Sequence, residues 1–98
     1  MERVRIKWTH TTDIICVPDI IAKNIDQYTD DFREWVSGVS FDPSITHGTC
    51  FGIEQYISFL NDRYLSNHWE KVYLEYENYI PETERELLLF NRMKKIYF

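Results

Sequence analysis

Apolar residues that recur every three or four positions dominate the segment from residue 18 to residue 37. Ile21, Ile25, Tyr28, Phe32 and Trp35 follow one another at steps of four, three, four and three. This spacing places their side chains on one face of an α-helix, so the segment predicts a helix that packs against a core. Any fold of this chain must therefore provide a layer that covers this face.

The sequence also predicts where this helix begins and ends. Pro18 suits a first helical turn because its φ angle is already helical, and Asp19 follows where the helix dipole favours an anion. Gly38 is predicted to end the helix. Residues 39–48 then hold Pro, Asp, Ser and Thr, which indicates a loop.

Two other segments, residues 3–8 and 72–76, alternate between apolar and polar side chains. This period of two predicts half-buried strands. Bases line the polar face of the first strand and acids that of the second, so we expect the two strands to pair. The apolar run of residues 14–17 fits either another strand or the lead into the helix.

Two more helices are expected. Residues 50–66 carry apolar side chains at helical spacing, and a last helix is expected to follow Pro81 and run through Ile96, because Thr83 and Glu86 form a capping-box pattern. The 98 residues, 44% of them hydrophobic, suffice for one core. The sequence therefore predicts an α+β fold with three helices on a small antiparallel sheet, in a single domain spanning residues 1–98.

Negative charge is concentrated around the first helix. Residues 13–42 hold seven acids against two bases and so carry the whole formal net charge of −5. Asp26 and Asp30 stand four residues apart, where like charges repel across a helix turn. A solvated helix face is the simpler explanation, but uncompensated repulsion favours a surface kept for a basic protein partner. The partner-binding residues expected on this basis are Asp19, Asp26, Asp30, Asp31, Glu34 and Asp42.

Composition argues against several classes of function. A sequence pI near 5.1 disfavours nucleic acid as a partner, because phosphate binding needs clustered bases. No stretch approaches the roughly 18 apolar residues of a membrane span, and no apolar leader is visible, so we expect a soluble protein. Cys16 and Cys50 form no disulfide framework, which favours reduced thiols in the cytoplasm.

Catalytic and metal-binding patterns are weak. His47 and Cys50 have the spacing of a zinc-ligand pair, but His10 and Cys16 make only a loose second pair, so no metal site is expected. A histidine-based nuclease would also need a cationic surface for phosphate, which this chain lacks. The residues available for such chemistry are His10, His47, His68 and Lys71. We therefore expect no enzyme, no catalytic residues and no cofactor.

Two aromatic residues bear on where a partner could bind. Trp69 is expected to pack under the sheet edge, with a surface anchor as the alternative. Phe59 lies off the apolar face of its helix and is expected to be the most exposed aromatic there.

Part of the sequence resembles the immunity proteins of cloacin and ribosome-cleaving colicins. The resemblance rests on Gly38, Val39, Phe41, Gly48, Cys50, Phe51, Leu60 and Tyr64. In size, acidity and lack of motifs the chain is also similar to immunity proteins of contact-dependent growth inhibition and other polymorphic toxin systems. These resemblances imply an inhibitor that binds one nuclease toxin in the cytoplasm of the producing cell. The alternatives are a phage-encoded acidic protein that mimics nucleic acid, and a small enzyme or metal protein.

Overall fold

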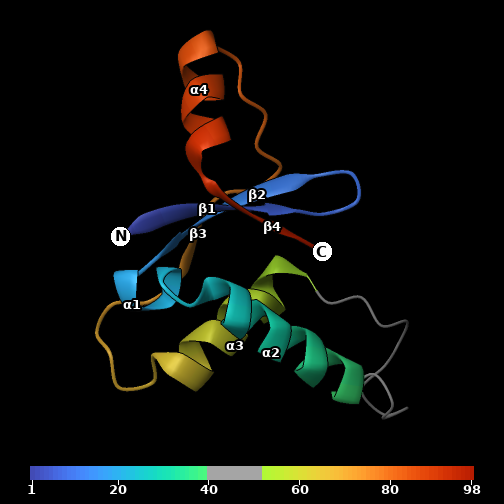
Figure 1. Cartoon of the computed structure of the whole chain (residues 1–98), viewed down its shortest axis with the longest axis vertical. Coiled ribbons are helices and arrows are strands. Elements are labelled where there is room, and N and C mark those ends of the chain that lie inside the picture. Colours follow the sequence, from blue (N-terminus) through green and yellow to red (C-terminus); the bar gives the residue numbers. More distant parts are fainter. Residues whose placement is uncertain (40–51) are drawn as a thin grey trace.

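The computed structural model describes residues 1–39 and 52–98. It is an α+β fold in which α1, α2 and α3 cover one face of a sheet while α4 stands on the other (Figure 1). The elements in chain order are β1 (Glu2–Lys7), β2 (Thr12–Val17), α1 (Asp19–Ala22), α2 (Ile25–Val39), α3 (Ile53–Tyr64), β3 (Tyr73–Tyr76), α4 (Glu84–Arg92) and β4 (Lys94–Tyr97). The described helices include none long and apolar enough to cross a membrane.

The sheet is mixed, with the strand order β3-β2-β1-β4. β1 pairs antiparallel with β2 and parallel with β4, while β3, among the described strands, pairs with β2 alone. The expected pairing of β1 with β3 is therefore wrong, because the apolar run of residues 14–17 is a strand that lies between them. Residues 13–17 are all buried, and a strand buried on both faces loses the alternation that would have marked it.

The charge pairing that suggested neighbouring strands nevertheless forms. Arg3 Nε on β1 donates a 2.8 Å hydrogen bond to Glu75 Oε2 on β3, reaching across β2. Cys16 on β2 also donates its thiol to the same oxygen, at 2.7 Å. The small Cys16 side chain thus leaves room for a contact between strands that are not adjacent.

The last helix is shorter than expected, because residues 94–97 form a strand. The capping box is confirmed: Glu86 N donates to Thr83 Oγ1 at 3.1 Å, and Thr83 N donates to Glu86 Oε2 at 3.2 Å. Met93 then turns extended, with φ −70° and ψ 144°. The chain continues as β4 because its backbone can pair with the free edge of β1.

The helix expected at residues 18–37 is broken into two. α1 ends at Ala22 and α2 begins at Ile25, with Asn24 N donating to Ile21 O at 3.1 Å in the turn between them. Ile21 and Ile25 are both buried against the sheet, so the break keeps both in the core. Asp19 consequently belongs to α1 and not to the helix that carries the other acids.

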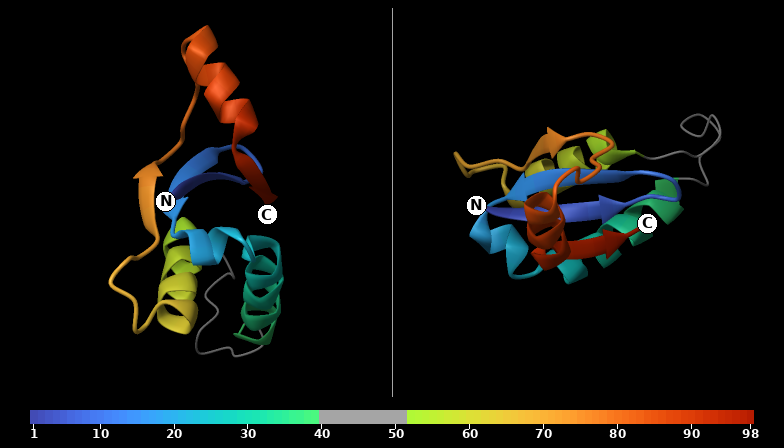
Figure 2. Two further views of the ribbon diagram at one scale, coloured as in Figure 1. Left: turned by 60° about the vertical axis from the view of Figure 1, so that its left-hand side comes forward. Right: turned by 90° about the horizontal axis from the view of Figure 1, so that it is seen from above.

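The core lies between the sheet and the pair α2 and α3, as the two views of Figure 2 show. Phe32 stands at its centre, with ring centroids 5.1 Å from Tyr56 and 5.3 Å from Phe59. Phe59 is only 7% exposed, so its expected exposure is wrong. Trp69 is 90% exposed in the connection after α3, so its expected packing is wrong, while its role as an anchor stays a prediction.

Candidate protein-binding surface

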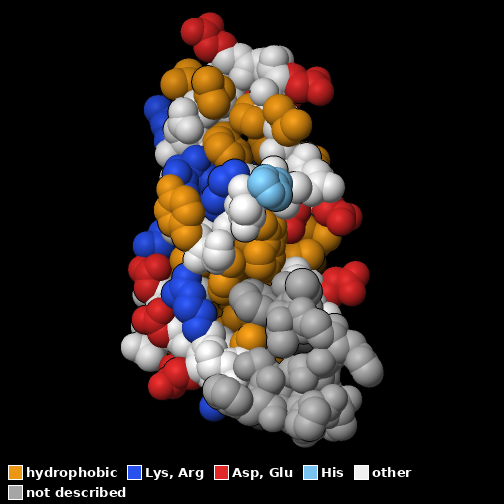
Figure 3. Space-filling model, turned by 90° about the vertical axis from the view of Figure 1, so that its right-hand side faces the viewer, with side chains coloured by type: hydrophobic (Ala, Val, Ile, Leu, Met, Phe, Trp, Pro, Cys, Tyr) orange, Lys and Arg blue, Asp and Glu red, His pale blue; other side chains and the backbone are white. Residues whose placement is uncertain are grey.

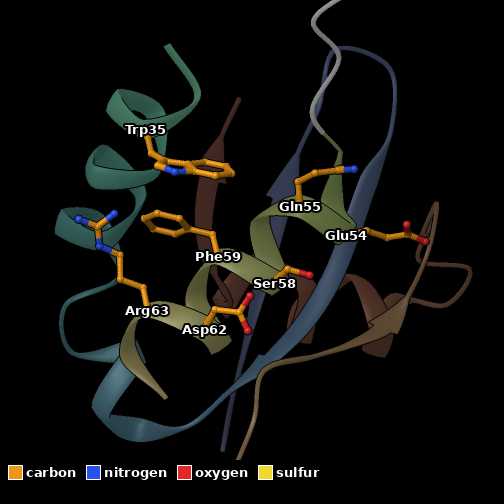
Figure 4. Close-up of a pocket in the computed structure, with 7 residues that line it drawn as sticks. All are labelled: Trp35, Glu54, Gln55, Ser58, Phe59, Asp62 and Arg63. Atoms are coloured by element: carbon orange, nitrogen blue, oxygen red, sulfur yellow. The ribbon is translucent and has the colours of Figure 1, made fainter. Parts of the chain in front are cut away.

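A cleft lies between α2 and α3 on the side of these helices that faces away from the sheet. It has a volume of about 470 Å³ and is lined by Trp35, Glu54, Gln55, Ser58, Phe59, Asp62 and Arg63. Figure 4 shows the rings of Trp35 and Phe59 side by side, and their centroids are 5.5 Å apart. Trp35 is 45% exposed although it continues the apolar face of α2. Its indole therefore combines a packed side with a side open to a partner.

Acids surround this cleft. A neighbouring hollow of about 350 Å³ is lined by Asp31, Glu34, Trp35 and Arg63, and shares Trp35 and Arg63 with the cleft. We call the two hollows together the acidic cleft. Among the described residues, its lining holds four acids, namely Asp31, Glu34, Glu54 and Asp62, against one base, Arg63.

The single base does not neutralise the cleft. The guanidinium of Arg63 lies 5.2 Å from the centroid of the Phe59 ring, in a cation–π arrangement. Within the described residues no ion pair joins Arg63 to an acid. The acidic cleft therefore presents a net negative charge around an exposed aromatic residue.

One of these acids is fixed in place. Tyr64 Oη donates to Asp31 Oδ2 at 2.9 Å, and Gln27 Nε2 donates to Asp31 Oδ1 at 3.0 Å. Tyr28 stacks on Tyr64, with ring centroids 3.8 Å apart. Burial, together with the bond to Asp31, raises the pKa of Tyr64 to about 12, so the phenol remains a donor at neutral pH. Asp31 is thus held at the rim before any partner arrives.

Three other predicted contact residues are matched by cations of the same chain. Asp26 Oδ2 lies 2.8 Å from Lys94 Nζ, Asp30 Oδ1 lies 2.9 Å from Arg33 Nη1, and Asp19 lies 3.6 Å from the terminal amine. All three acids remain about 70% exposed, so these pairs are weak and can exchange. The internal pairs nevertheless reduce the charge that this flank offers to a partner. Asp42 lies outside the described residues.

Lys94 compensates this flank because β4 runs beside α2, whereas Arg33 lies on α2 itself, three residues after Asp30. Lys94 belongs to β4, and Arg33 donates a 2.5 Å hydrogen bond to the carbonyl oxygen of Tyr97 on the same strand. Arg33 also lies 5.2 Å from the centroid of the Phe98 ring. A helical prediction for residues 94–97 could not place Lys94 next to Asp26.

Sequence reasoning missed the contribution of α3 to the acidic cleft. The polar face of this helix is nearly neutral overall, which drew attention away from it. Glu54, Ser58 and Asp62 stand four residues apart and so form one row along α3. That row was the available signal. Its position opposite Trp35 depends on how α2 and α3 pack.

The other candidate groups are scattered in the described part of the chain. His10 follows β1 and His68 follows α3, and these two connections lie at opposite ends of the molecule (Figure 1). Cys16 is buried, and burial with the bond to Glu75 raises the pKa of its thiol. The described residues contain no cluster of three or more His, Cys, Asp or Glu suited to a metal ion. His47 and Cys50 lie outside the described residues.

Comparison of the chain with protein-family models, with curated proteins and with solved structures found no match. Function is therefore argued from the chemistry and geometry of the acidic cleft.

Proposed function

We propose that this chain is an immunity protein that binds a cognate bacterial nuclease toxin and covers the toxin's basic active site. The observation that supports this proposal is the exposed Trp35 in a cleft ringed by four acids. A nuclease must bind phosphates, so its active site is lined by Lys and Arg. An acidic surface with an aromatic centre complements such a site in both charge and shape.

The residues of the acidic cleft have different roles in binding. Trp35 acts as the anchor, because a half-packed indole can enter a pocket without losing much side-chain entropy. Asp31 and Glu34 from α2, with Glu54 and Asp62 from α3, attract the toxin and accept hydrogen bonds from its bases. Asp31 is already ordered by Tyr64 in the free protein, so it loses little side-chain entropy on binding.

The acids outside the cleft have a secondary part in this proposal. Asp26 and Asp30 can contribute only if the toxin's cations replace Lys94 and Arg33. Because exposed pairs of this kind contribute about 0.2–1 kcal/mol, such replacement costs little. The partner surface is thus centred on the acidic cleft, and the remainder of α2 forms its margin.

The proposal predicts that a nuclease toxin domain is encoded beside the gene for this chain, and the test uses that domain. Co-expression should restore growth to bacteria that make this domain, and the purified proteins should form a one-to-one complex. If a toxic neighbouring nuclease is not neutralised and does not bind the chain, the immunity proposal is wrong.

Point variants then test the acidic cleft as the interface. Trp35→Ala should weaken binding by about 30-fold, the effect of losing an interface anchor of about 2 kcal/mol. Glu34→Gln combined with Glu54→Gln should slow association and flatten its dependence on salt. Glu2→Gln combined with Glu82→Gln also removes two exposed acids, both outside the cleft, and serves as the matched control. Unchanged binding by the cleft variants, with thermal unfolding intact, would place the interface elsewhere.

A further inference from the structure

Helix α4 makes few contacts with the rest of the fold. It spans Glu84–Arg92 and stands on the sheet face opposite α2 and α3 (Figures 1 and 2). Phe90 turns toward the body, where its ring lies 5.8 Å from that of Tyr79 and 4.7 Å from the guanidinium of Arg5. Leu89 and Arg92 border an open hollow at the sheet. No residue of α4 is buried. A helix of nine residues is marginally stable in water unless an apolar face is packed, so this helix lacks much of its cover.

The uncovered surface of α4 is strongly apolar. Leu87, Leu88 and Leu89 are between 47% and 59% exposed, and Ile80, in the segment that leads into the helix, is 75% exposed. A helix with large apolar side chains around most of its circumference is normally buried. This surface is therefore better suited to an interface than to water.

The side of α4 opposite Phe90 carries a row of three residues, the last of which, Arg92, also borders a hollow at the sheet that Arg3 and Glu75 line. Leu88 lies two positions from Phe90, a rotation of about 200°, and so occupies the opposite side of the helix. Glu84 and Arg92 stand four residues before and after Leu88 and share its side. All three side chains are exposed. The row therefore runs acid, leucine, base along the outer side of the helix.

Two copies of this row complement each other in charge when they run antiparallel. If two such rows run antiparallel, the leucines meet in the middle and each acid meets a base. A two-fold interface has this property, since each contact between two different residues occurs twice. The row thus fits a second copy of the same chain better than an unrelated surface.

The charges around α4 follow the same order, with acids at its tip and bases at its foot. The tip of the helix and the turn before it hold Glu82, Glu84 and Glu86 against Arg85. The bases on the outer sheet face around the foot of α4 are Arg3, Arg5, Lys7 and Lys95. Figure 3 shows acids at the far end of the molecule, hydrophobic side chains below them and bases further down. The tip of one copy would therefore face the foot of the other with opposite charge.

We propose that the chain forms a two-fold dimer through antiparallel α4 helices. Leu88 lies on the two-fold axis against Leu88 of the partner subunit, and Glu84 pairs with Arg92 of the partner subunit. The acidic cleft lies on the other face of the sheet and stays open in both copies. The dimer is thus independent of the proposed immunity function, and either proposal can fail without the other.

Sedimentation equilibrium of the full chain tests this dimer. The apparent mass should rise from 12.0 kDa toward twice that value as concentration increases. Concentrations from about 1 μM to about 1 mM cover the Kd values of weak to moderate complexes. A monomer throughout that range would overturn the proposal and would leave α4 as a surface for a different protein.

Charge reversal distinguishes this interface from any other dimer. Glu84→Arg or Arg92→Glu alone should weaken the dimer by about ten-fold, because symmetry creates two like-charge pairs in each case. The double variant should restore dimer formation, since each reversed charge again meets its opposite. Glu84 and Arg92 are eight residues apart on one helix, so this rescue requires contact between two chains.

Two further variants complete the test. Leu88→Lys should weaken the dimer by about 100-fold or more, because it places two cations at the axis. Glu77→Arg makes the same acid-to-arginine change beside the start of α3 and should leave the dimer intact. A dimer that tolerates all the α4 variants, or a double reversal that fails to restore it while thermal unfolding is normal, would show that α4 is not the interface.

Discussion

Tyr64 on α3 donates a 2.9 Å hydrogen bond to Asp31 on α2. This bond and the 3.8 Å stack of Tyr64 on Tyr28 join the two helices that form the acidic cleft. The pair links stability with binding, because the carboxylate that the phenol orients is also one of the proposed contacts.

Tyr64→Phe should lower the free energy of unfolding by about 1 kcal/mol, the typical net value of a hydrogen bond to a partly exposed charged group. The stack on Tyr28 needs no hydroxyl and should persist. Urea unfolding measures the change, with Tyr76→Phe on β3 as the control that removes an exposed hydroxyl. Equal stability of the two variants would mean that the bond to Asp31 contributes nothing.

The buried pair of Thr29 and Tyr56 predicts an asymmetric pair of single variants. Thr29 Oγ1 lies 2.6 Å from the Ile25 carbonyl oxygen and 2.8 Å from Tyr56 Oη. Thr29 has one proton, and the carbonyl of Ile25 can only accept, so the Tyr56 phenol is the donor to Thr29. Burial raises the pKa of Tyr56 to about 12, which keeps that proton in place.

Thr29→Val leaves the buried Tyr56 phenol without an acceptor and should cost about 2 kcal/mol, whereas Tyr56→Phe leaves the bond to Ile25 intact and should cost about 1 kcal/mol. The double variant should cost less than the sum of the two, because no buried hydroxyl is then left unpaired. Urea unfolding of the wild type, the two single variants and the double variant completes this double-mutant cycle. Strict additivity would contradict the coupling of the two hydroxyls, and a larger cost for Tyr56→Phe than for Thr29→Val would contradict the donor assignment.

The contact of Glu75 with Arg3 predicts acid sensitivity. The hydrogen bond from Arg3 lowers the pKa of Glu75 below its ordinary 4.5. A carboxylate whose pKa is lower in the folded state adds stability above its unfolded pKa and loses it as pH falls through the folded pKa. Because Arg3 is half exposed, the contribution at neutral pH should be below about 1 kcal/mol.

Urea unfolding of the wild type and Glu75→Gln should therefore differ most near pH 7 and converge by about pH 3. Glu77→Gln, an exposed acid two residues further along, is the control. A difference that stays constant from neutral to acid pH would attribute the effect to packing and not to charge.

The pair of Lys94 and Asp26 allows the masking of the α2 flank to be measured. Lys94→Met should cost less than about 1 kcal/mol of stability, since the pair is exposed. The variant leaves Asp26 without its cation, so association with the proposed basic partner should become faster and more sensitive to salt. Lys7→Met, on the outer face of the sheet, changes the net charge equally. Equal association rates for the two variants would show that the net charge of the chain, and not the exposure of Asp26, sets the rate of association.

Local sequence patterns predicted most of the helices and strands but not which strands lie next to one another. The strand at residues 2–7, the helix at 53–64 and the capping box before α4 follow from short-range spacing and local hydrogen bonds. The parallel pairing of β4 with β1 joins residues about 90 positions apart, and no local pattern encodes it. Lys94 and Ile96 fitted a helical continuation, and only the free edge of β1 made the strand more favourable.

The candidate site shows the same division. Charge density alone indicated α2 as the acidic element, and Asp31 and Glu34 belong to the acidic cleft. The i, i+3 spacing of Asp30 and Arg33 was enough to suggest their pair. The sequence could not show that Lys94 compensates Asp26, nor that Glu54 and Asp62 from α3 lie beside Trp35. Charge composition is a property of residues, whereas electrostatic potential depends on distances between elements.

By itself, the sequence determined the α+β class, the apolar faces that form the core and the excess of acids around α2, because periodicity and composition act over one or two helical turns. The tertiary structure decided which strands pair, which acids keep their charge unmatched and which apolar side chains remain exposed. These outcomes depend on packing between segments that are distant in the chain. Trp35 is the clearest case: its spacing predicts burial, and only the packing of α2 against α3 leaves it open.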